Sequence, residues 1–146
     1  MKKLNVLVLC TGNSARSQIA EGMIRKHLGD RFNVYSAGTE PKGVNPFTIA
    51  AMKEAGIDLS GARSKHLDEY LGKLPVHYLI IVCHDADQKC PAIWPGIRER
   101  LFWPFEDPAA VTGSDEEKLD KFRAVRDQIE AKILAWGAAL RDGQSA

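Results

Sequence analysis

The sequence predicts a single α/β domain built on a parallel sheet with helices on both faces. Two observations support this fold class. The first is the presence of short apolar runs at residues 4–9 and 78–82, which are typical of buried strands. The second is that these runs alternate with segments whose apolar residues recur every three or four positions, which is typical of helices. Strands buried on both faces of a parallel sheet have such uninterrupted apolar runs. The length of 146 residues fits one domain, which we assign to residues 1–146.

The expected elements have recognisable boundaries. Gly29 ends the first helix, and Asn45 followed by Pro46 is a typical helix start, with Gly56 closing that helix. In order, we expect a strand at 4–9, a helix at 14–28, a strand at 33–36, a helix at 46–55, a short helix at 64–71, and strands at 78–82 and 100–103.

A long last helix is expected after Ser114, because Ser114 and Glu117 form a capping box. This helix carries a one-sided apolar stripe, which we assign to the core: Leu119, Phe122, Val125, Ile129, Ile133, Trp136 and Leu140.

Composition and charge exclude several classes of protein. The formal net charge is +1, and Lys and Arg are spread along the chain, so nucleic acid is not expected as a partner. No uncharged apolar run approaches the roughly 18 residues of a membrane span, and the first residues lack the cleavage site of a signal peptide. Three cysteines, an odd number, argue against a secreted disulfide framework. We therefore expect a cytoplasmic protein with reduced thiols.

The first candidate site is the connection between the first strand and the first helix, Cys10–Thr11–Gly12–Asn13–Ser14–Ala15–Arg16–Ser17. Five residues separate Cys10 from Arg16, which is enough to curl the backbone around one tetrahedral anion. Gly12 tolerates positive φ, and Asn13 is one of the few other residue types that visits this region. Backbone N–H groups of the loop can then point inward, and the N-terminus of the helix adds positive potential.

The same loop offers a nucleophile. The planar guanidinium of Arg16 matches two oxygens of an anion, and this cation together with the helix dipole favours the ionised thiolate of Cys10. The hydroxyl of Ser14 or Ser17 can donate a hydrogen bond to that thiolate. The alternative is a buried structural cysteine and a surface arginine. The position of the pattern between a strand and a helix favours the anion site.

Cys83 and Cys90 form a second cluster, directly after the strand at 78–82. Neighbouring parallel strands end at the same edge of a sheet, so Cys83 should lie near Cys10. In a helix, residues seven apart are separated by about 10.5 Å along the axis. A disulfide needs Cα atoms within about 7 Å, so joining this pair requires the turn to collapse. The two cysteines could instead be packed in the core, but the segment between them is strongly polar. They could also bind a metal together with His84, but their spacing matches no common zinc pattern. We therefore favour redox chemistry.

In combination these motifs resemble a known family. The first loop is similar to the phosphate-binding loop of low-molecular-weight protein tyrosine phosphatases, and more closely to that of the arsenate reductases that share their fold. The likeness continues over nearly the whole chain, notably in Arg16–Ser17–Gln18, Ala20–Glu21–Gly22, Tyr35–Ser36–Ala37–Gly38 and Gly43–Val44–Asn45–Pro46. The resemblance implies an arsenate reductase of the thioredoxin-coupled type that serves arsenic detoxification.

The resemblance further implies that three cysteines act in turn. Cys10 would attack arsenate, Cys83 would attack Cys10 and release arsenite, and Cys90 would attack Cys83 by thiol–disulfide exchange. Phosphate or sulfate would compete for the anion loop. Thioredoxin is the expected electron donor, with glutaredoxin–glutathione or mycothiol as alternatives, and we expect a monomer.

The resemblance also assigns a role to Asp107. In both families an Asp-Pro loop brings a carboxylate over the anion loop, and Asp107–Pro108 matches it. Such a carboxylic acid can protonate the leaving oxygen or assist thiol deprotonation. An alternative function is a phosphatase that acts on phosphoesters through Cys10, Arg16 and Asp107. Its case is weakened because two alanines follow the dipeptide where phosphatases usually have tyrosines. A third alternative is a non-enzymatic oxyanion-binding or redox-sensing module.

The chain departs from the family pattern at two positions. Many relatives have a further cysteine where this chain has Ala15. Some relatives bind an alkali cation through residues that match Asn13, Glu21 and Ser36 and an acidic residue, but the position of that acid is occupied by Lys65. We therefore expect neither a cofactor nor a metal. Our hypothesis is that the Lys65 ammonium takes the place of the cation and pairs with Glu21.

Overall fold

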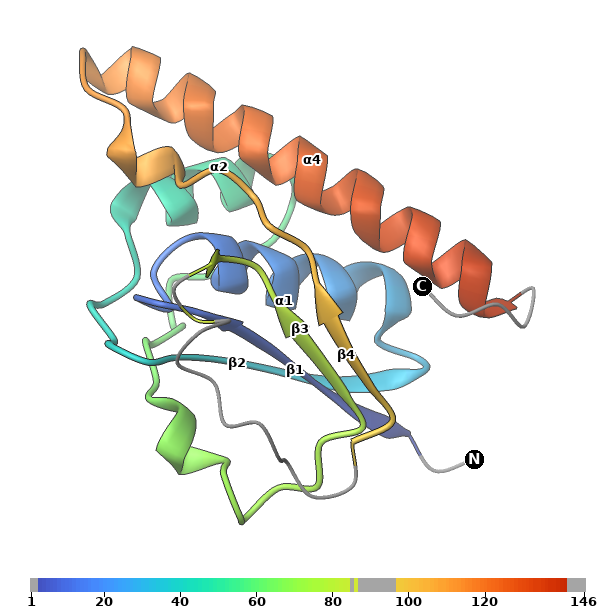
Figure 1. The fold of residues 1–146 in the computed structure, drawn as a ribbon. Helices are drawn as coiled ribbons and strands as arrows, with labels where there is room; N and C mark the ends of the chain where they lie inside the picture. Colours follow the sequence, from blue (N-terminus) through green and yellow to red (C-terminus); the bar gives the residue numbers. More distant parts are fainter. Residues whose placement is uncertain (1–2, 85, 87–96, 142–146) are drawn as a thin grey trace.

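The computed structural model describes residues 3–84, 86 and 97–141. Its centre is a four-stranded sheet in the order β2–β1–β3–β4, in which every neighbouring pair is parallel. The strands are β1 (Leu4–Cys10), β2 (Phe32–Gly38), β3 (Tyr78–Ile81) and β4 (Glu99–Phe102). The predicted parallel α/β fold is confirmed (Figure 1).

Three α-helices pack together on one face of this sheet (Figure 1). They are α1 (Arg16–Leu28), α2 (Pro46–Glu54) and α4 (Asp115–Arg141). Two short 3-10 helices complete the described elements, η1 (Leu67–Glu69) and η2 (Pro108–Ala110). In Figure 1, η1 lies on the side of the sheet opposite to α1.

The core lies between the sheet and the three helices. The apolar stripe of α4 faces it, with Phe122, Val125, Ile129, Ile133 and Trp136 buried, and Leu119 and Leu140 partly buried. The Trp136 ring stacks on Phe32 at a centroid distance of 5.2 Å and meets Tyr78 and Trp103 edge-on. Such aromatic contacts add to the free energy gained from burying large side chains. The assignment of this stripe to the core is confirmed.

The predicted helix caps are also observed. The Asn45 side chain accepts a hydrogen bond from the Phe47 N–H at 2.8 Å. The Ser114 Oγ accepts from the Glu117 N–H at 3.2 Å, and Glu117 Oε1 accepts from the Ser114 N–H at 3.3 Å. These contacts satisfy backbone N–H groups that have no partner inside the helix.

Two expected boundaries are wrong, for related reasons. The first helix begins at Arg16 and not at Ser14, because residues 11–15 are used by the anion loop. The helix expected at 64–71 is reduced to η1, because Ser64 and Lys65 make hydrogen bonds to Asn13 in that loop. Tertiary contacts outweigh local helix preference here.

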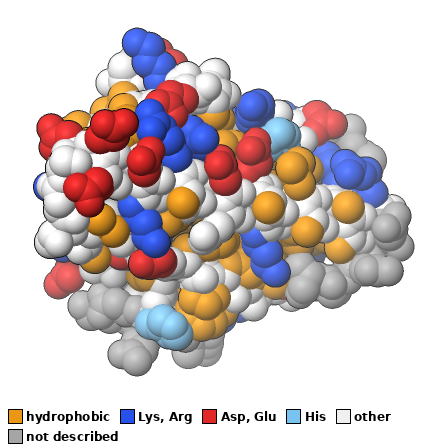
Figure 2. Space-filling view, turned by 90° about the horizontal axis from the view of Figure 1, so that it is seen from above, with side chains coloured by type: hydrophobic (Ala, Val, Ile, Leu, Met, Phe, Trp, Pro, Cys, Tyr) orange, Lys and Arg blue, Asp and Glu red, His pale blue; other side chains and the backbone are white. Residues whose placement is uncertain are grey.

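Ion pairs tie α2 to α4 on the outside of the molecule. Glu54 accepts hydrogen bonds from Arg123 Nη2 at 2.6 Å and from Arg126 Nη1 at 3.2 Å. The hydrogen bonds from Arg123, followed by the attraction of both guanidinium groups, lower the pKa of Glu54 from 4.5 to about 2. Figure 2 shows acidic and basic side chains interleaved on this face. None of the described helices combines the length and the apolar character needed to cross a bilayer.

Candidate active site: the loop from Cys10 to Ser17

The anion loop begins where β1 ends, at Cys10, and leads into α1. The Cys10 side chain is buried, and its Sγ lies 2.8 Å from Ser17 Oγ and accepts from the Asn13 N–H at 3.2 Å. Of the two serines expected to hydrogen-bond to this sulfur, Ser17 is the one in contact with it. Asn13 has a φ of 47°, as predicted, whereas Gly12 does not have positive φ, so the left-handed turn is made at Asn13 alone.

The carbonyl groups of this loop are held from outside by other segments. Each carbonyl from Cys10 to Ser14 accepts a hydrogen bond, from Thr39 N (3.3 Å), Glu40 N (2.9 Å), Lys42 N (3.0 Å), Ser64 Oγ (2.6 Å) and Asn45 N (3.0 Å) in that order. In a planar trans peptide the C=O and the N–H of the following residue point in opposite directions. Fixing the carbonyls outward therefore directs the N–H groups of residues 11–15 inward, which is the arrangement that binds an anion.

Gly38 allows this close approach between the loop and β2. It pairs with Cys10 in the sheet, and a Cβ atom at this position would lie 2.4 Å from the Thr11 carbonyl oxygen. Only glycine leaves room for the loop backbone here.

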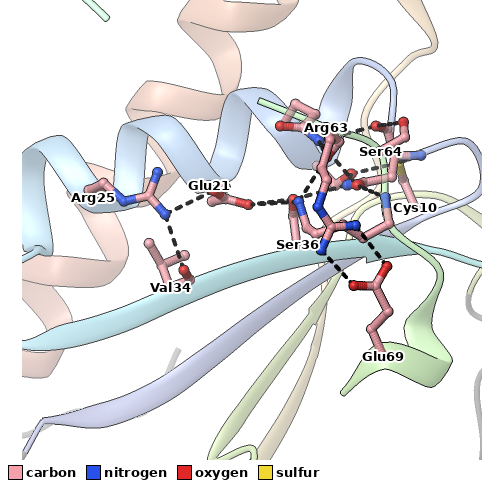
Figure 3. Close-up of polar contacts among 12 residues, drawn as sticks. Cys10, Glu21, Arg25, Val34, Ser36, Arg63, Ser64 and Glu69 are labelled. Carbon is pink, nitrogen blue, oxygen red and sulfur yellow. Dashed lines mark hydrogen bonds and ion pairs between the residues drawn. The ribbon is translucent and has the colours of Figure 1, made fainter. Parts of the chain in front are cut away.

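A polar network supports the loop from the side away from the anion. The fully buried Asn13 donates from Nδ2 to Ser17 Oγ (2.8 Å) and Ser36 Oγ (2.9 Å), and its Oδ1 accepts from the Lys65 N–H (2.9 Å). The Ser36 hydroxyl donates to Glu21 Oε1 at 2.5 Å. Figure 3 shows this network extending from Cys10 to Glu21. Because buried polar groups are costly unless they are paired, these contacts fix the Asn13 side chain, and with it the turn of the loop.

Glu21 lies between two cations at the far end of the network. Arg25 Nη2 is 2.8 Å from Glu21 Oε2, and Lys65 Nζ is 3.8 Å from Glu21 Oε1. The Lys65 ammonium also donates to the Arg63 carbonyl at 3.0 Å. Burial lowers the pKa of Lys65, and the Glu21 carboxylate opposes that effect. Lys65 therefore lies beside the carboxylate with which it was expected to pair.

Arg16 and Asp107 meet across the mouth of the loop. Arg16 Nη1 donates to the Phe105 carbonyl at 3.1 Å, and its Nη2 is 3.9 Å from Asp107 Oδ2. The other carboxylate oxygen of Asp107 accepts from the Ala109 N–H at 3.0 Å, which caps η2 and orients the side chain. The Asp107 side chain remains about half exposed, so it is accessible from solvent.

The second thiol is also brought to the loop. Cys83 follows β3, the neighbour of β1 in the sheet, and its Sγ lies 3.4 Å from Thr11 Oγ1. Cys10 and Cys83 are both buried, and neither takes part in a disulfide. The remaining cysteine of the predicted relay, Cys90, lies outside the described residues.

A cavity of about 110 Å³ opens over the loop, lined by Cys10, Thr11, Gly12, Ser14, Ala15, Arg16, Lys42, Asp107 and Ala109. It brings together the predicted anion loop, the nucleophile and the carboxylate. Ser17 and Asn13 lie beneath this surface and act on the loop through hydrogen bonds. The sequence analysis missed Lys42 and Ser64. Neither is part of a recognisable pattern, and only the path of the chain brings them to the loop.

In the part of the chain that the structure describes, no three His, Cys, Asp or Glu residues form a potential metal site. His84, which follows Cys83, is exposed, and its ring contacts Phe102 edge-on at a centroid distance of 5.0 Å.

Comparisons with known proteins show the family to which this chain belongs. Residues 5–146 match the family model described as low molecular weight phosphotyrosine protein phosphatase. The chain therefore belongs to the low-molecular-weight phosphotyrosine protein phosphatase family. An arsenate reductase of Halalkalibacterium halodurans is 48% identical over 133 residues, which cover 91% of this chain and 94% of that protein.

Solved structures include similar arsenate reductases. One, described as an arsenate reductase in the phosphate binding state, has a TM-score of 0.77 and 31% identity, covering 92% of this chain and 97% of its own. A thioredoxin-dependent arsenate reductase of Corynebacterium glutamicum has a TM-score of 0.73 and 27% identity, covering 97% of this chain and 64% of its own.

Proposed function

We propose that this protein reduces arsenate to arsenite and thereby serves arsenic detoxification. The observation that carries the proposal is the second thiol at the loop, with Cys83 Sγ 3.4 Å from Thr11 Oγ1. A phosphatase needs only the Cys10 nucleophile and an acid, whereas a reductase needs a further thiol that can take over the oxidised sulfur. The high identity to an arsenate reductase over nearly the whole chain supports the same choice.

The reaction begins with oxyanion binding in the loop. The inward N–H groups and Arg16 hold three oxygens of arsenate, and the Cys10 thiolate attacks arsenic. Asp107, protonated from solvent, donates that proton to one arsenate hydroxyl group, which leaves as water. The product is an adduct in which Cys10 Sγ is bonded to As(V).

Reduction occurs when a second thiolate attacks sulfur. Cys83 Sγ attacks Cys10 Sγ, forming the S–S bond, and the electron pair of the S–As bond stays on arsenic, which leaves as As(III) arsenite. Cys90 then attacks Cys83, releasing the Cys10 thiolate and leaving a Cys83–Cys90 disulfide. An external dithiol reduces that disulfide and completes the cycle.

The electron donor in this proposal is thioredoxin, because a disulfide formed between two cysteines only seven positions apart suits a dithiol protein. The similarity to a thioredoxin-dependent reductase supports it. Glutaredoxin with glutathione, and mycothiol, are the competing donors. The free thiols require a reducing compartment, so we place the enzyme in the cytoplasm, and we expect it to act as a monomer.

No alkali cation is needed in this proposal. The Lys65 ammonium, 3.8 Å from Glu21 Oε1, supplies the positive charge that an ion would otherwise bring beside that carboxylate. Activity should therefore be the same in sodium and potassium buffers of equal ionic strength. A steep, saturable rise of activity with potassium would contradict this part of the proposal.

The test is the release of arsenite from arsenate, assayed with each of the three donors in turn. Cys83→Ser and Cys90→Ser should abolish turnover, while Cys83→Ser still binds phosphate because the loop is intact. A phosphatase would instead hydrolyse a small phosphoester equally well in both variants. A sensor would bind the anion but turn over with no donor. Either result would overturn the reductase assignment.

A further inference from the structure

Lys42 is presented to the anion loop by a segment that is fixed to the loop backbone. The N–H groups of Thr39, Glu40, Lys42 and Asn45 all donate to loop carbonyls. Gly43 has a φ of 90°, which turns the chain so that Asn45 returns to Ser14. The Cα atom of Lys42 is thus held at a set distance from the loop.

The Lys42 side chain then lies over Gly12. Its Cδ would be 3.4 Å from a Cβ atom built on Gly12, so the methylene groups follow the loop surface. Lys42 lines the cavity together with Cys10 and Arg16, yet the residue is exposed. Long charged side chains commonly pack their methylene groups on protein while the ammonium stays in water.

Lys42 adds a second cation to the cavity, beside Arg16. Three charged side chains line it, Arg16, Lys42 and Asp107, and the carboxylate of Asp107 offsets one of the two cations. The neighbouring Glu106 is directed away and paired with Lys121 at 2.5 Å. Within the described residues Lys42 has no carboxylate at ion-pairing distance, so its charge remains available to a ligand.

From this we infer that Lys42 is an oxyanion-recruiting residue, which raises the affinity of the loop for doubly charged oxyanions such as arsenate and phosphate. The choice of arsenate as the substrate rests on the proposed function, whereas the effect of Lys42 concerns only the binding of an anion. A cation at the open mouth of a cavity attracts an anion during its approach and stabilises the bound anion equally in the ground state and in the transition state. The effect should therefore appear in association and affinity, and not in the chemical step.

The experiment compares Lys42→Met and Lys42→Arg with the wild type. The matched control is Lys53→Met, since Lys53 is an exposed lysine on α2 that does not line the cavity. Dissociation constants for inorganic phosphate are measured by calorimetry at low and at high salt. KM and kcat for arsenate are measured in parallel with the active donor. Thermal unfolding of each variant verifies that the fold is intact.

Lys42→Met should weaken phosphate binding and raise KM by about 5- to 30-fold at low salt, with kcat nearly unchanged. The difference should shrink at high salt because exposed charges are screened. Lys42→Arg should restore binding, and Lys53→Met should equal the wild type. The inference is overturned if Lys42→Met binds phosphate as the wild type does, or if Lys53→Met weakens binding equally. Phosphate binding needs no turnover, so failure of the reductase assignment would leave this readout unaffected.

Discussion

Gly38 is the position where one added methyl group should disable the anion loop. In Gly38→Ala, the new Cβ would lie 2.4 Å from the Thr11 carbonyl oxygen and 2.9 Å from the Asn13 nitrogen. Both are backbone atoms, so no side-chain rotation relieves the overlap. Gly38 also pairs with Cys10 across β1 and β2, so the strand cannot shift without breaking the sheet register. The loop must therefore move away from β2.

The size of the effect follows from this forced movement. Overpacking of this kind costs about 1–3 kcal/mol, and a chain of this length loses about 2–4 °C of melting temperature per kcal/mol. We expect the melting temperature to fall by about 2–12 °C. The displaced loop should also lose its inward N–H groups, so that phosphate no longer protects the protein against unfolding.

The assay is thermal unfolding by circular dichroism, with and without inorganic phosphate. Gly61→Ala is the matched control, because a Cβ atom there meets nothing within 4 Å and the residue does not have positive φ. This control should melt at or slightly above the wild-type temperature and respond to phosphate normally. The reasoning is refuted if Gly38→Ala shows the wild-type rise in melting temperature on adding phosphate.

Three further predictions concern single side chains. Glu54 has a folded-state pKa of about 2, below its ordinary 4.5, so its stabilising effect is complete above about pH 4.5 and is lost as the pH falls toward 2. In urea unfolding at pH 7 and pH 3, Glu54→Gln should lose less stability on acidification than the wild type, and equal losses would contradict the ion-pair argument. Ser17→Ala removes the hydroxyl 2.8 Å from Cys10 Sγ. In this variant, alkylation of Cys10 by iodoacetamide at neutral pH, followed by peptide mass spectrometry, should slow by about tenfold, since hydrogen bonds to charged groups contribute about 1.5–3 kcal/mol. An unchanged alkylation rate would rule out a role for this contact. Ser114→Ala should lower the free energy of unfolding by about 1 kcal/mol through loss of the cap, while a change in phosphate affinity would show that the cap acts beyond its helix.

The anion loop could be predicted from the sequence because its main residues are close together in the chain. Cys10 and Arg16 are in one short segment, and the positive φ at Asn13 follows from its residue type and place. The expected helix at 64–71 failed because Ser64 and Lys65 bind Asn13, some fifty positions earlier in the chain. The helix preference of residues 64–71 gives no information about a contact with such a distant part of the chain.

The sequence by itself determined the alternation of strands and helices, the caps of α2 and α4, and the place of the proposed nucleophile Cys10 in the loop between β1 and α1. These depend on residue types at short spacings, where backbone geometry and side-chain periodicity act locally. Only the tertiary structure decided which segments hold the loop carbonyls outward and that Lys42 lies at the mouth of the cavity. The sequence placed Cys83 near Cys10 through the expected parallel strands, and the structure adds its contact with Thr11. Those arrangements join residues about 30 to 70 positions apart, and their geometry is set by the packing of the whole sheet and by the paths of the loops that leave it.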